Sequence, residues 1–353
     1  PHTTGSPMTA NTQALPGTAV IVGRWQIFHK GHETLLRTAL GLADQVIVVI
    51  GSAYRSRNPQ NPFTWQERQS MILSTLSEQD TARVQFLPVR DYYDDTRWNA
   101  AVREGVKQLA PSTPANAITL VGFKKDHTSY YLDNFHPWAW KEVEQDIEID
   151  ATALRNVYFE GADPDARLEV MRPYVSASVL AYLQAWARLA LYAERVTEHT
   201  AVVNYRKRWA APFHLTADAI VQARGSVLLV RRGGNIGHGL WALPGGFVEP
   251  GERMYTAALR ELHEETGFKT LASTMQAAFK GSVVFDHPGR SPRGRIITHA
   301  CHFDLGNVGL PEVKGADDAQ EARWIPLEDL AGMEDQLFDD HAAVLDHFFG
   351  LYR

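Results

Sequence analysis

Short apolar runs that alternate with amphipathic stretches characterise the first half of the chain. Residues 18–22 (Thr-Ala-Val-Ile-Val) and 45–50 (Gln-Val-Ile-Val-Val-Ile) are rich in β-branched side chains, and a glycine follows each run. Runs of this length are typical of strands that are buried on both faces of a sheet. A helical pattern begins near Gly31, soon after the first run. The order of strand, tight loop and helix predicts the start of an α/β sheet that binds nucleotides.

The pattern changes at about Leu215. Before this point, residues 168–197 carry apolar side chains at mixed three- and four-residue spacing and are expected to be helical. After it, strands and a closing helix are expected at residues 216–221 and 226–231 (a hairpin), 283–285, 295–305, 323–325 and 336–349. A further helix is expected at residues 255–266, because Gly267 follows where a left-handed cap is needed.

Composition narrows the class of protein. A chain of 353 residues has room for two domains, and contents of 44% hydrophobic and 22% charged residues are those of an ordinary globular protein. The net charge of -6, without a long basic run, argues against nucleic acid as a partner. Cys301 is the only cysteine, which excludes an intrachain disulfide. Because neither a membrane span nor a signal peptide is evident, we expect a cytoplasmic protein without a membrane partner.

Clustered carboxylates mark the helix expected at residues 255–266. Glu261, Glu264 and Glu265 are three and four residues apart, so they share one face within about one helical turn. Their mutual repulsion would be relieved by a hard cation, and all-oxygen ligation favours Mg²⁺ or Mn²⁺ over zinc. The alternative is a solvated acidic face with no ligand.

The loop after the first strand has a different chemistry. Residues 23–32 have the sequence Gly-Arg-Trp-Gln-Ile-Phe-His-Lys-Gly-His. Backbone amides at a helix start bind anionic oxygens, and His29 and His32 lie three residues apart on one face, where both can donate to a phosphate. The alternative is a polar helix start without a ligand.

Two family resemblances follow from these motifs. Residues 246–268, preceded by Trp-Ala-Leu-Pro-Gly, match G-x5-E-x7-R-E-U-x-E-E-x-G-U at every fixed position, which resembles the signature of the Nudix hydrolases. The His-Lys-Gly-His run resembles the H-x-G-H motif of the nucleotidyltransferase superfamily. Together with residues 50–53, 61–68, 121–126, 129–131 and 135–138, the longer loop resembles nicotinamide mononucleotide (NMN) adenylyltransferases of the archaeal type, and in particular the bifunctional bacterial proteins that add a Nudix domain.

The resemblance implies a fold for each domain. It implies a Rossmann-like domain, a parallel sheet with helices on both faces, at residues 18–197, and a Nudix α/β/α sandwich with a mixed sheet at residues 213–353. Residues 198–212, which include a short basic stretch, are expected to be an exposed linker. Residues 1–17 are expected to be the remnant of a tag and a disordered lead-in.

For the first domain, the resemblance implies adenylyl transfer from ATP to NMN, giving NAD and pyrophosphate. His29 and His32 would contact the ATP phosphates, Mg²⁺ would arrive with the nucleotide, and Arg24 would neutralise developing charge. Trp98 would stack on the nicotinamide ring, unless it is a core residue. The nucleotide-binding set implied is Gly23, Trp25, Gln26, Phe28, Gly31, Gly51, Ser52, Arg57, Asn61, Phe63, Thr64, Trp98, Gly122, Lys124 and Asp126.

The first domain departs from its family at two places. Residues 25–27 are Trp-Gln-Ile where the family usually has Phe-Gln-Pro, so the proline restraint on φ is absent. A later family motif ends in an arginine, and Ala181 stands at the corresponding position. Another cation must take its place, and the candidates are Arg24, Arg55, Arg57 and Lys124.

For the second domain, the resemblance implies metal-dependent hydrolysis of ADP-ribose to AMP and ribose 5-phosphate. Glu261 and Glu264 would be catalytic, and the metal ligands would be Glu252, Glu261, Glu264 and Glu265, held in place by Arg260. The substrate would contact Gly245, Gly246, Arg290 and Arg293, although the two arginines could also form an exposed turn. The general base stays open among Glu264, Glu312, Asp317 and Asp318.

Three alternatives stay open. The first domain could use another nucleotide acceptor, the Nudix domain could hydrolyse NADH or other nucleoside diphosphate derivatives, or it could bind an NAD metabolite as a sensor without hydrolysis. Clustered carboxylates disfavour the sensor. The sequence leaves open whether the chain forms homo-oligomers.

Overall fold

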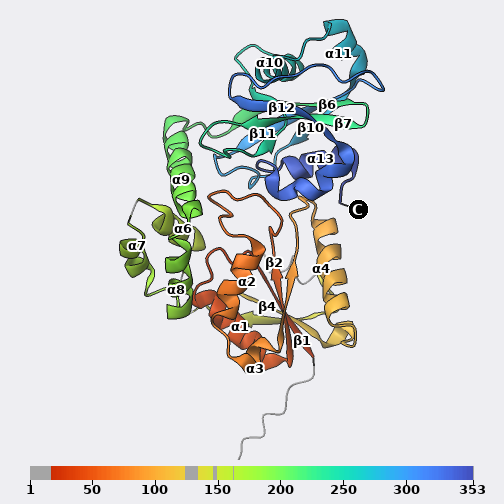
Figure 1. Cartoon of the computed structure of the whole chain (residues 1–353). Helices are drawn as coiled ribbons and strands as arrows, with labels where there is room; N and C mark the ends of the chain where they lie inside the picture. The colour runs from red at the N-terminus through yellow and green to blue at the C-terminus, as the bar shows by residue number, and fades with distance from the viewer. Residues whose placement is uncertain (1–16, 124–133, 146–148, 162, 353) are drawn as a thin grey trace, which may run out of the picture.

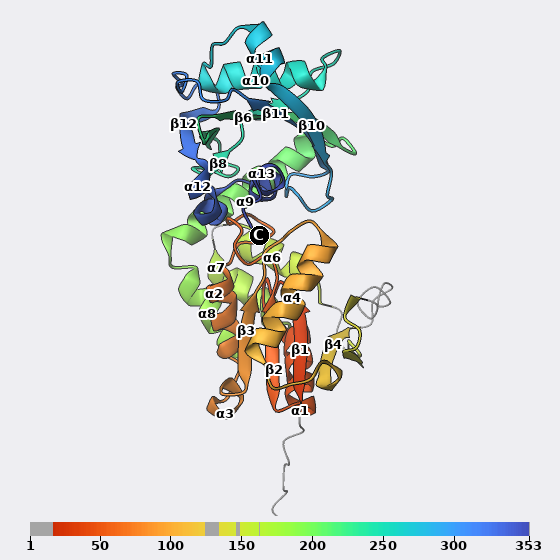
Figure 2. The same cartoon turned by 90° about the vertical axis from the view of Figure 1, so that its right-hand side faces the viewer.

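The structure, a computed structural model, describes residues 17–123, 134–145, 149–161 and 163–352. It contains two sheets, one above the other in Figure 1, each with its own covering helices. Helix α9 (Ala190–Arg208) extends beside both halves of the molecule. Helix α13 (His341–Phe349) lies where the halves meet, close to the C-terminus (Figure 2).

The first sheet has five parallel strands in the order β3-β2-β1-β4-β5. Their bounds are β1 Thr18–Gly23, β2 Gln45–Ile50, β3 Val84–Pro88, β4 Ile118–Phe123 and β5 Ala139–Val143. The strands predicted at residues 18–22 and 45–50 are confirmed as neighbours, with Thr18 opposite Gln45 and Gly23 opposite Ile50. Because the strands are parallel, the loops after β1 and β2 leave the same edge of the sheet.

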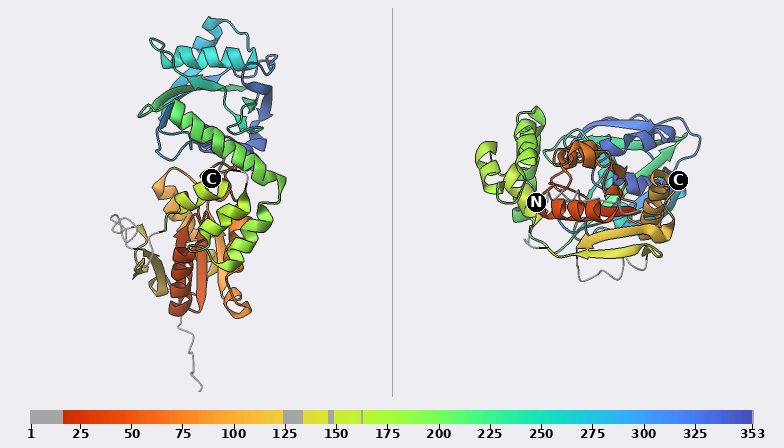
Figure 3. Two further views of the ribbon diagram at one scale, coloured as in Figure 1. Left: turned by 90° about the vertical axis from the view of Figure 1, so that its left-hand side faces the viewer. Right: turned by 90° about the horizontal axis from the view of Figure 1, so that it is seen from below.

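Alternate residues of β1 face two different cores. Ala19 and Ile21 pack in a core with helix α1 (Lys30–Leu42), whereas Val20 packs in a core with helix α4 (Asp95–Leu109). Helices therefore cover both faces of the sheet, which confirms the Rossmann-like fold (Figure 3). The other helices of this half are α2 Trp65–Leu73, α3 Glu78–Thr81, η1 Ala115–Ala117, α6 Ala151–Phe159, α7 Pro164–Met171 and α8 Ala177–Trp186.

The helical stretch expected at residues 168–197 is divided among α7, α8 and α9, and α9 continues to Arg208. Most of the segment expected to be an exposed linker is therefore helical. Glu198 and His199 are only 3% and 8% exposed, because α9 packs against both halves, and Glu198 Oε1 accepts a hydrogen bond from Gly237 N at 2.8 Å. The basic residues of the expected linker lie in the last turn of α9, where positive charge interacts favourably with the helix dipole.

The second sheet is mixed, in the order β10-β11-β6-β7-β12, with β8 beside β7 and β9 beside β6. The bounds are β6 His214–Ala223, β7 Ser226–Arg232, β8 Trp241–Ala242, β9 Gly245–Phe247, β10 Phe279–Phe285, β11 Ile296–Asp304 and β12 Ala319–Pro326. Strands β6 and β11 are parallel, and the other neighbours are antiparallel. The predicted hairpin is present, but β6 and β7 pair only at its turn and then diverge, because β9 pairs with β6 and β8 with β7.

Helices cover both faces of the second sheet. Ala219 packs with Leu262 of α10 (Met254–Thr266) on the side that also holds α11 (Ala272–Ala278), and Leu229 packs with Val344 of α13 on the other. This arrangement confirms the expected sandwich. The closing helix begins at His341 rather than at residue 336. Short helices α12 (Leu327–Leu330) and η2 (Ala331–Gln336) precede it, and Asp339 has a left-handed φ of 47° that interrupts the helix.

The loops at the carboxyl edge of the first sheet, and the start of α4, contact the C-terminal segment of the second half. Several polar contacts link the halves there, including Ser56 Oγ to Leu337 O at 2.6 Å, Arg90 Nε to Glu334 Oε2 at 3.0 Å, and Arg97 Nη1 to Asp346 Oδ2 at 2.6 Å. These contacts hold the loops of the first sheet against α13 and the segment that precedes it.

Candidate active sites

The two predicted histidines lie together at the N-terminus of α1. Their rings stack with centroids 3.6 Å apart, and each Nδ1 accepts a backbone N–H of the other residue at 3.4 Å. These contacts form a reciprocal cap of the helix. Because both Nδ1 atoms are acceptors, the neutral rings carry their protons on Nε2. Gly31 leaves room for this stack, since a Cβ there would lie 3.1 Å from the His29 ring.

Burial determines the charge of His29. The side chain is 3% exposed, and burial lowers the pKa of His29 to about 4, although the charge of Asp150 acts in the opposite direction. His29 is therefore neutral at pH 7 and offers one hydrogen-bond donor to a ligand. The positive charge of the site must come from other residues.

Three arginines supply that charge. Arg24 is exposed, whereas Arg68 and Arg155 are 0% and 4% exposed. Burial lowers the pKa values of both buried arginines, and the charge of Arg24 adds a smaller effect in the same direction. Within the described part of the chain, no carboxylate forms a salt bridge with any of the three. Mutual repulsion between guanidinium groups around one loop would be relieved by a polyphosphate.

Several residues of the predicted nucleotide-binding set are structural. Trp25 and Phe28 are 1% and 0% exposed, and Trp25 Nε1 donates to Val49 O at 2.9 Å. Gln26 is 1% exposed and exchanges hydrogen bonds with the backbone of Phe63, both at 3.1 Å. Gly23 is required by Trp25, whose indole would lie 2.9 Å from a Cβ at that position. These residues shape the loop and have little surface for direct contact with a nucleotide.

The loops after β2 complete this edge. Gly51 N donates to Gly23 O at 2.9 Å, which joins the two loops, and Ser52 Oγ donates to Asp91 Oδ1 at 3.0 Å. Asn61 is buried against Gln26, and Thr64 caps α2. Hydrogen bonds thus join Gly51 and Asn61 to the loop that leads to α1.

Of the four cations considered as replacements for the missing arginine, Arg24 is the one that the described structure leaves exposed and without a carboxylate partner. Arg57 forms two hydrogen bonds with Glu67, and Arg55 lies at the junction of the halves, 3.3 Å from Asp91. Lys124 and Asp126, both in the predicted set, lie outside the described residues.

Trp98 and Gly122 occupy the opposite side of the first sheet from α1. Trp98 is partly buried against the α4 core, with its ring at 86° to that of Phe135. It therefore retains surface for a stacked ring. A Cβ at position 122 would lie 2.5 Å from the ring of Trp140, so packing against this ring requires a glycine there.

The second candidate site is centred on Arg260 of α10. Its guanidinium contacts Glu252 at 3.0 Å, Glu261 at 2.7 Å and Glu264 at 2.9 Å, and also donates to Phe247 O at 2.8 Å. Arg260 thus holds the glutamates, as the sequence analysis expected. These ion pairs raise the pKa of Arg260 and keep it charged.

Glu265 and Glu261 face the Gly245–Gly246 strand. Glu265 Oε2 accepts the amide of Gly245 at 3.0 Å, and the Glu261 carboxylate packs directly on Gly246, where a Cβ would lie 2.5 Å from Cδ. Burial raises the pKa of Glu265 to about 8, to which the charge of Glu261 contributes, and burial also raises the pKa of Glu261. Two buried carboxylates whose ionised forms are this disfavoured would gain from a neighbouring cation.

These residues fit a divalent metal by their chemistry. Among the described residues, no three carboxylate, imidazole or thiol side chains are already gathered around a common point, because Arg260 lies between Glu252, Glu261 and Glu264. The donor set is nonetheless all oxygen and close together, and Glu264 keeps 44% of its side chain exposed. A hard divalent cation could compete with Arg260 for these oxygens.

The two arginines predicted to contact the Nudix substrate form ion pairs instead. Arg290 is 3% exposed and donates to Asp340 Oδ1 and Oδ2 at 2.8 and 2.9 Å, which argues against the substrate contact predicted for it. Arg293 is 3.3 Å from Asp339 and lies over the ring of Phe338 at 5.1 Å. A salt bridge between distant segments cannot be recognised from a motif.

The candidates for a general base differ in position. Residues 314–316 run beside the end of α10, with Ala316 N bonded to Glu265 O at 3.0 Å. This brings the charge of Asp317 close enough to Glu261 to raise its pKa. Glu312 and Asp318 are exposed, and neither is among the charges that chiefly shift the pKa values of Glu261 and Glu265.

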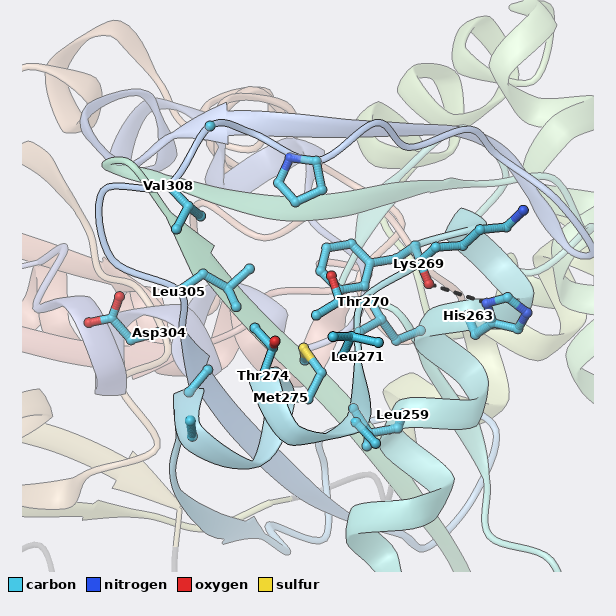
Figure 4. Close-up of a pocket in the computed structure, with 17 residues that line it drawn as sticks. Leu259, His263, Lys269, Thr270, Leu271, Thr274, Met275, Asp304, Leu305 and Val308 are labelled. Carbon is cyan, nitrogen blue, oxygen red and sulfur yellow. Dashed lines mark hydrogen bonds between the residues drawn. The ribbon is translucent and has the colours of Figure 1, made fainter.

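A large cavity lies elsewhere in the second half. It has a volume of about 1030 Å³ and is lined mainly by apolar residues of α10, α11 and the segment after β11. Figure 4 shows Leu259, Met275 and Leu305 pointing into it, and His263 bonded to the backbone at its edge. At about 100° per residue, Leu259 lies about 160° around α10 from Glu261, and the lining includes none of the four clustered glutamates. The cavity is therefore separate from the carboxylate site.

A parallel nucleotide-binding sheet and a glutamate helix on a mixed sheet define a chain that joins a nucleotidyltransferase to a Nudix domain. Residues 20–105 match the cytidylyltransferase-like family model, and residues 212–348 match the NUDIX domain. A nicotinamide/nicotinic acid mononucleotide adenylyltransferase of Acinetobacter baylyi is 35% identical over 171 residues, which cover 47% of this chain and 90% of that protein. An ADP-ribose pyrophosphatase of Methanocaldococcus jannaschii is 32% identical over 162 residues, which cover 45% of this chain and 88% of that protein.

A solved structure resembles both halves together. It is a bifunctional NMN adenylyltransferase/ADP-ribose pyrophosphatase from Francisella tularensis in complex with AMP and a manganese ion, with a TM-score of 0.85 and 30% identity over 95% of this chain and 99% of that chain. The chain belongs to this family of bifunctional NMN adenylyltransferase/ADP-ribose pyrophosphatase proteins. Within the described residues, no helix combines the length and apolarity needed to cross a bilayer.

No role was predicted from the sequence for Arg68 or Arg155. A signal was present, because Arg68 lies three and four residues before Met71 and Ile72, which are buried, so a charge is placed on the apolar face of a helix. Arg155 occupies the equivalent situation beside Leu154 and Tyr158. Their partners are backbone carbonyls, which no motif identifies.

Proposed function

We propose that the first domain transfers the adenylyl group of ATP to NMN, and that the second hydrolyses ADP-ribose with Mg²⁺. The observation that carries the transferase assignment is the combination of Arg24, Arg68 and Arg155 with the imidazoles of His29 and His32 at the start of α1, whose Nδ1 atoms both accept backbone N–H groups. Positive charge that lacks carboxylate partners in the described structure suits a triphosphate.

In the transfer, an oxygen of the NMN 5′-phosphate attacks the α-phosphorus of ATP. The bond from that phosphorus to the bridging oxygen breaks, and pyrophosphate leaves with the electron pair. The nucleophile is already an anion, so no general base is required. His29 and His32 donate Nε2–H to phosphate oxygens, and Arg24 neutralises the charge that develops. Trp98 is the candidate platform for the nicotinamide ring.

In the hydrolysis, a water oxygen attacks one phosphorus of ADP-ribose and the P–O–P bond breaks, giving AMP and ribose 5-phosphate. A divalent ion held by the clustered glutamates would supply the polarisation of the phosphate and of the water. Glu261, Glu264 and Glu265 supply oxygen ligands, and Arg260 orients Glu261 and Glu264. Gly246 allows the Glu261 carboxylate to approach the strand.

Product analysis by chromatography tests the transferase. Wild-type protein with ATP, NMN and Mg²⁺ is expected to form NAD and pyrophosphate. Arg24→Gln is expected to lower kcat/KM by about 100-fold, the scale of a lost charge-stabilising contact. The matched control is Arg37→Gln, because Arg37 is also exposed but pairs with Asp80. Equal activity of the two variants would contradict the role of Arg24.

The hydrolase is tested in a separate reaction with ADP-ribose. AMP and ribose 5-phosphate are expected with Mg²⁺ and not with excess chelator, and Glu261→Gln should abolish the activity. Glu328→Gln, an exposed change on α12, serves as the control. Turnover of NADH but not ADP-ribose would change the assigned substrate, and binding of ADP-ribose without any hydrolysis would favour a sensor.

A further inference from the structure

Arg68 of α2 is a completely buried arginine that joins three segments of the transferase site. Its side chain is 0% exposed. Nη1 donates to Arg24 O at 2.8 Å and to Gly51 O at 2.7 Å, Nη2 donates to Ser52 O at 3.0 Å, and Nε donates to Thr64 O at 3.2 Å. One planar guanidinium thus connects the loop after β1, the loop after β2 and the N-terminus of α2.

The bonded carbonyls belong to residues that the transferase site uses. Arg24 is the exposed cation of the site, and its own carbonyl is held by Arg68. Gly51 N also donates to Gly23 O, so the two loops are tied together on both sides of the guanidinium. A displacement of Arg68 would therefore move the backbone that carries Arg24.

Arg155 of α6 holds the same loop from a second helix. Its Nη1 donates to Gln26 O, and its Nη2 donates to Thr152 Oγ1 at 3.1 Å. Arg68 and Arg155 therefore bind the carbonyls of two residues in the stretch that leads to His29. Neither guanidinium has a carboxylate within salt-bridge distance in the described structure.

The burial of these two arginines destabilises the folded state. Burying a charge without an anionic partner is unfavourable, and burial lowers the pKa of Arg68 to about 9. A neutral side chain could fill the same space without that cost. A functional reason for the charge is an anion that binds nearby, because Arg68 then both fixes the loop and adds to the positive potential that attracts the anion.

We propose that Arg68 is a positioning residue for adenylyl transfer, which clamps the carbonyls of Arg24, Gly51 and Ser52 so that Arg24 and the amides of the loops face the triphosphate, with Arg155 as the second clamp. This proposal rests on the proposed transferase function. Arg68 acts through the backbone and does not contact the substrate.

The test compares Arg68→Lys and Arg68→Met with a matched arginine at the other edge of the sheet. Arg83 also donates to backbone carbonyls, those of Leu40, Ala43 and Asp44, at 2.6, 2.6 and 3.2 Å. It precedes β3, so it lies at the amino edge of the parallel sheet, away from the site. Arg83→Met thus removes a comparable set of bonds to carbonyls, together with an ion pair to Asp80 at 3.3 Å, without touching the loops.

Steady-state kinetics of NAD formation, ATP binding by calorimetry and thermal unfolding are measured for each variant. Both Arg68 variants are expected to lose about 100-fold in kcat/KM, the effect of roughly 1 Å of misplacement, with a raised KM for ATP. Arg68→Lys should fail because an ammonium cannot span the carbonyls that a planar fork reaches. Arg83→Met should lower the unfolding temperature and leave kcat/KM within about 3-fold, since distant substitutions act independently.

A chemical rescue separates positioning from simple loss of stability. Added guanidinium, at concentrations of about 10 mM, should restore activity to Arg68→Ala and have no effect on Arg83→Ala, because the added ion can occupy the space that the side chain leaves. An equal response of the two alanine variants would overturn the proposal. So would an Arg68→Lys protein with wild-type kcat/KM.

The second domain gives an internal control in every sample. Hydrolysis of ADP-ribose by the Arg68 variants should stay at the wild-type rate, which shows that the chain is folded. If wild type forms no NAD, the proposed acceptor is wrong, and ATP binding then decides the role of Arg68. Wild-type ATP affinity in Arg68→Met would refute it.

Discussion

The fit between Gly246 and Glu261 allows a test of the carboxylate site by one methyl group. An ideal Cβ at Gly246 would lie 2.5 Å from Glu261 Cδ and 2.7 Å from Oε2, whereas ordinary contacts are 3.4–4 Å. Gly246 does not have a positive φ, so alanine is compatible with the backbone. The added methyl group must therefore be accommodated by movement of the Glu261 carboxylate, by about 1 Å.

A shift of that size has a calculable effect on hydrolysis. A misplacement of about 1 Å costs roughly 100-fold in rate, which corresponds to about 2.7 kcal/mol of transition-state stabilisation. We expect Gly246→Ala to lose about this factor in kcat/KM for ADP-ribose with Mg²⁺. Its stability should change by less than about 1 kcal/mol, since the contacted atoms end a side chain that can move.

Gly245→Ala, at the neighbouring position, should affect stability more than Gly246→Ala does. A Cβ at Gly245 would lie 2.7 Å from Ala217 O and 2.9 Å from Asp218 Cα, which are backbone atoms of β6. The pairing of β9 with β6 would have to shift, at a cost of about 1–3 kcal/mol, or about 2–4 °C in unfolding temperature per kcal/mol. Gly234→Ala is the control, because nothing lies within 4 Å of a Cβ there.

Three assays on each glycine variant decide the matter: ADP-ribose hydrolysis, NAD formation and thermal unfolding. We expect Gly246→Ala to be stable and inactive as a hydrolase, Gly245→Ala to be destabilised, and Gly234→Ala to resemble wild type. All three should form NAD at the wild-type rate. Full hydrolysis by Gly246→Ala would refute the assignment of Glu261 to the reacting centre.

Further predictions concern protonation, a buried ion pair and the general base. Burial lowers the pKa of folded His29 to about 4 from its ordinary value of 6.5, so protonation of this residue reduces stability by up to about 3 kcal/mol as pH falls from 6.5 to 4. Acid denaturation of His29→Asn should lack this loss. NAD formation should not titrate with His29 between pH 6 and 9. Asp340→Asn should cost about 3–5 kcal/mol, since Arg290 is left buried without its partner, and Arg290→Met combined with it should recover most of that loss in chemical denaturation. If Asp317 is the general base, Asp317→Asn should slow hydrolysis at saturating Mg²⁺ more than Glu264→Gln does. In that case Glu264→Gln should mainly raise the Mg²⁺ concentration that hydrolysis requires. A larger loss of rate in Glu264→Gln would identify Glu264 as the base.

The parts of the fold that the sequence predicted are those whose signals are local. Strand β1 and helix α10 were expected at residues 18–22 and 255–266 and span Thr18–Gly23 and Met254–Thr266. Hydrophobic runs and a terminal glycine with φ of 61° determine them within a single segment. The spacing of the glutamates likewise places them on one face without knowledge of the rest of the chain.

The parts that the sequence did not predict depend on segments far apart in the chain. Arg290 was expected to contact a substrate or to lie in an exposed turn, yet it is buried against Asp340, 50 residues later in the chain. The roles of Arg68 and Arg155 depend on carbonyl groups of other loops, which every residue type possesses. Packing between distant segments therefore decides whether an arginine contacts a ligand, an acid or the backbone.

Helix α9 shows why the boundary between the domains was the least predictable feature. Arg195 Nη1 donates to Arg57 O at 3.2 Å and to Glu198 Oε2 at 2.6 Å, and Glu198 Oε1 accepts Gly237 N at 2.8 Å. One helix thus binds a loop of the transferase domain and a loop of the Nudix domain, and its polar sequence resembles that of a linker. A division after residue 197 would separate Arg195 from Glu198, its buried ion-pair partner. We therefore propose that the functional boundary follows Arg208, where α9 ends, and that α9 belongs to both domains.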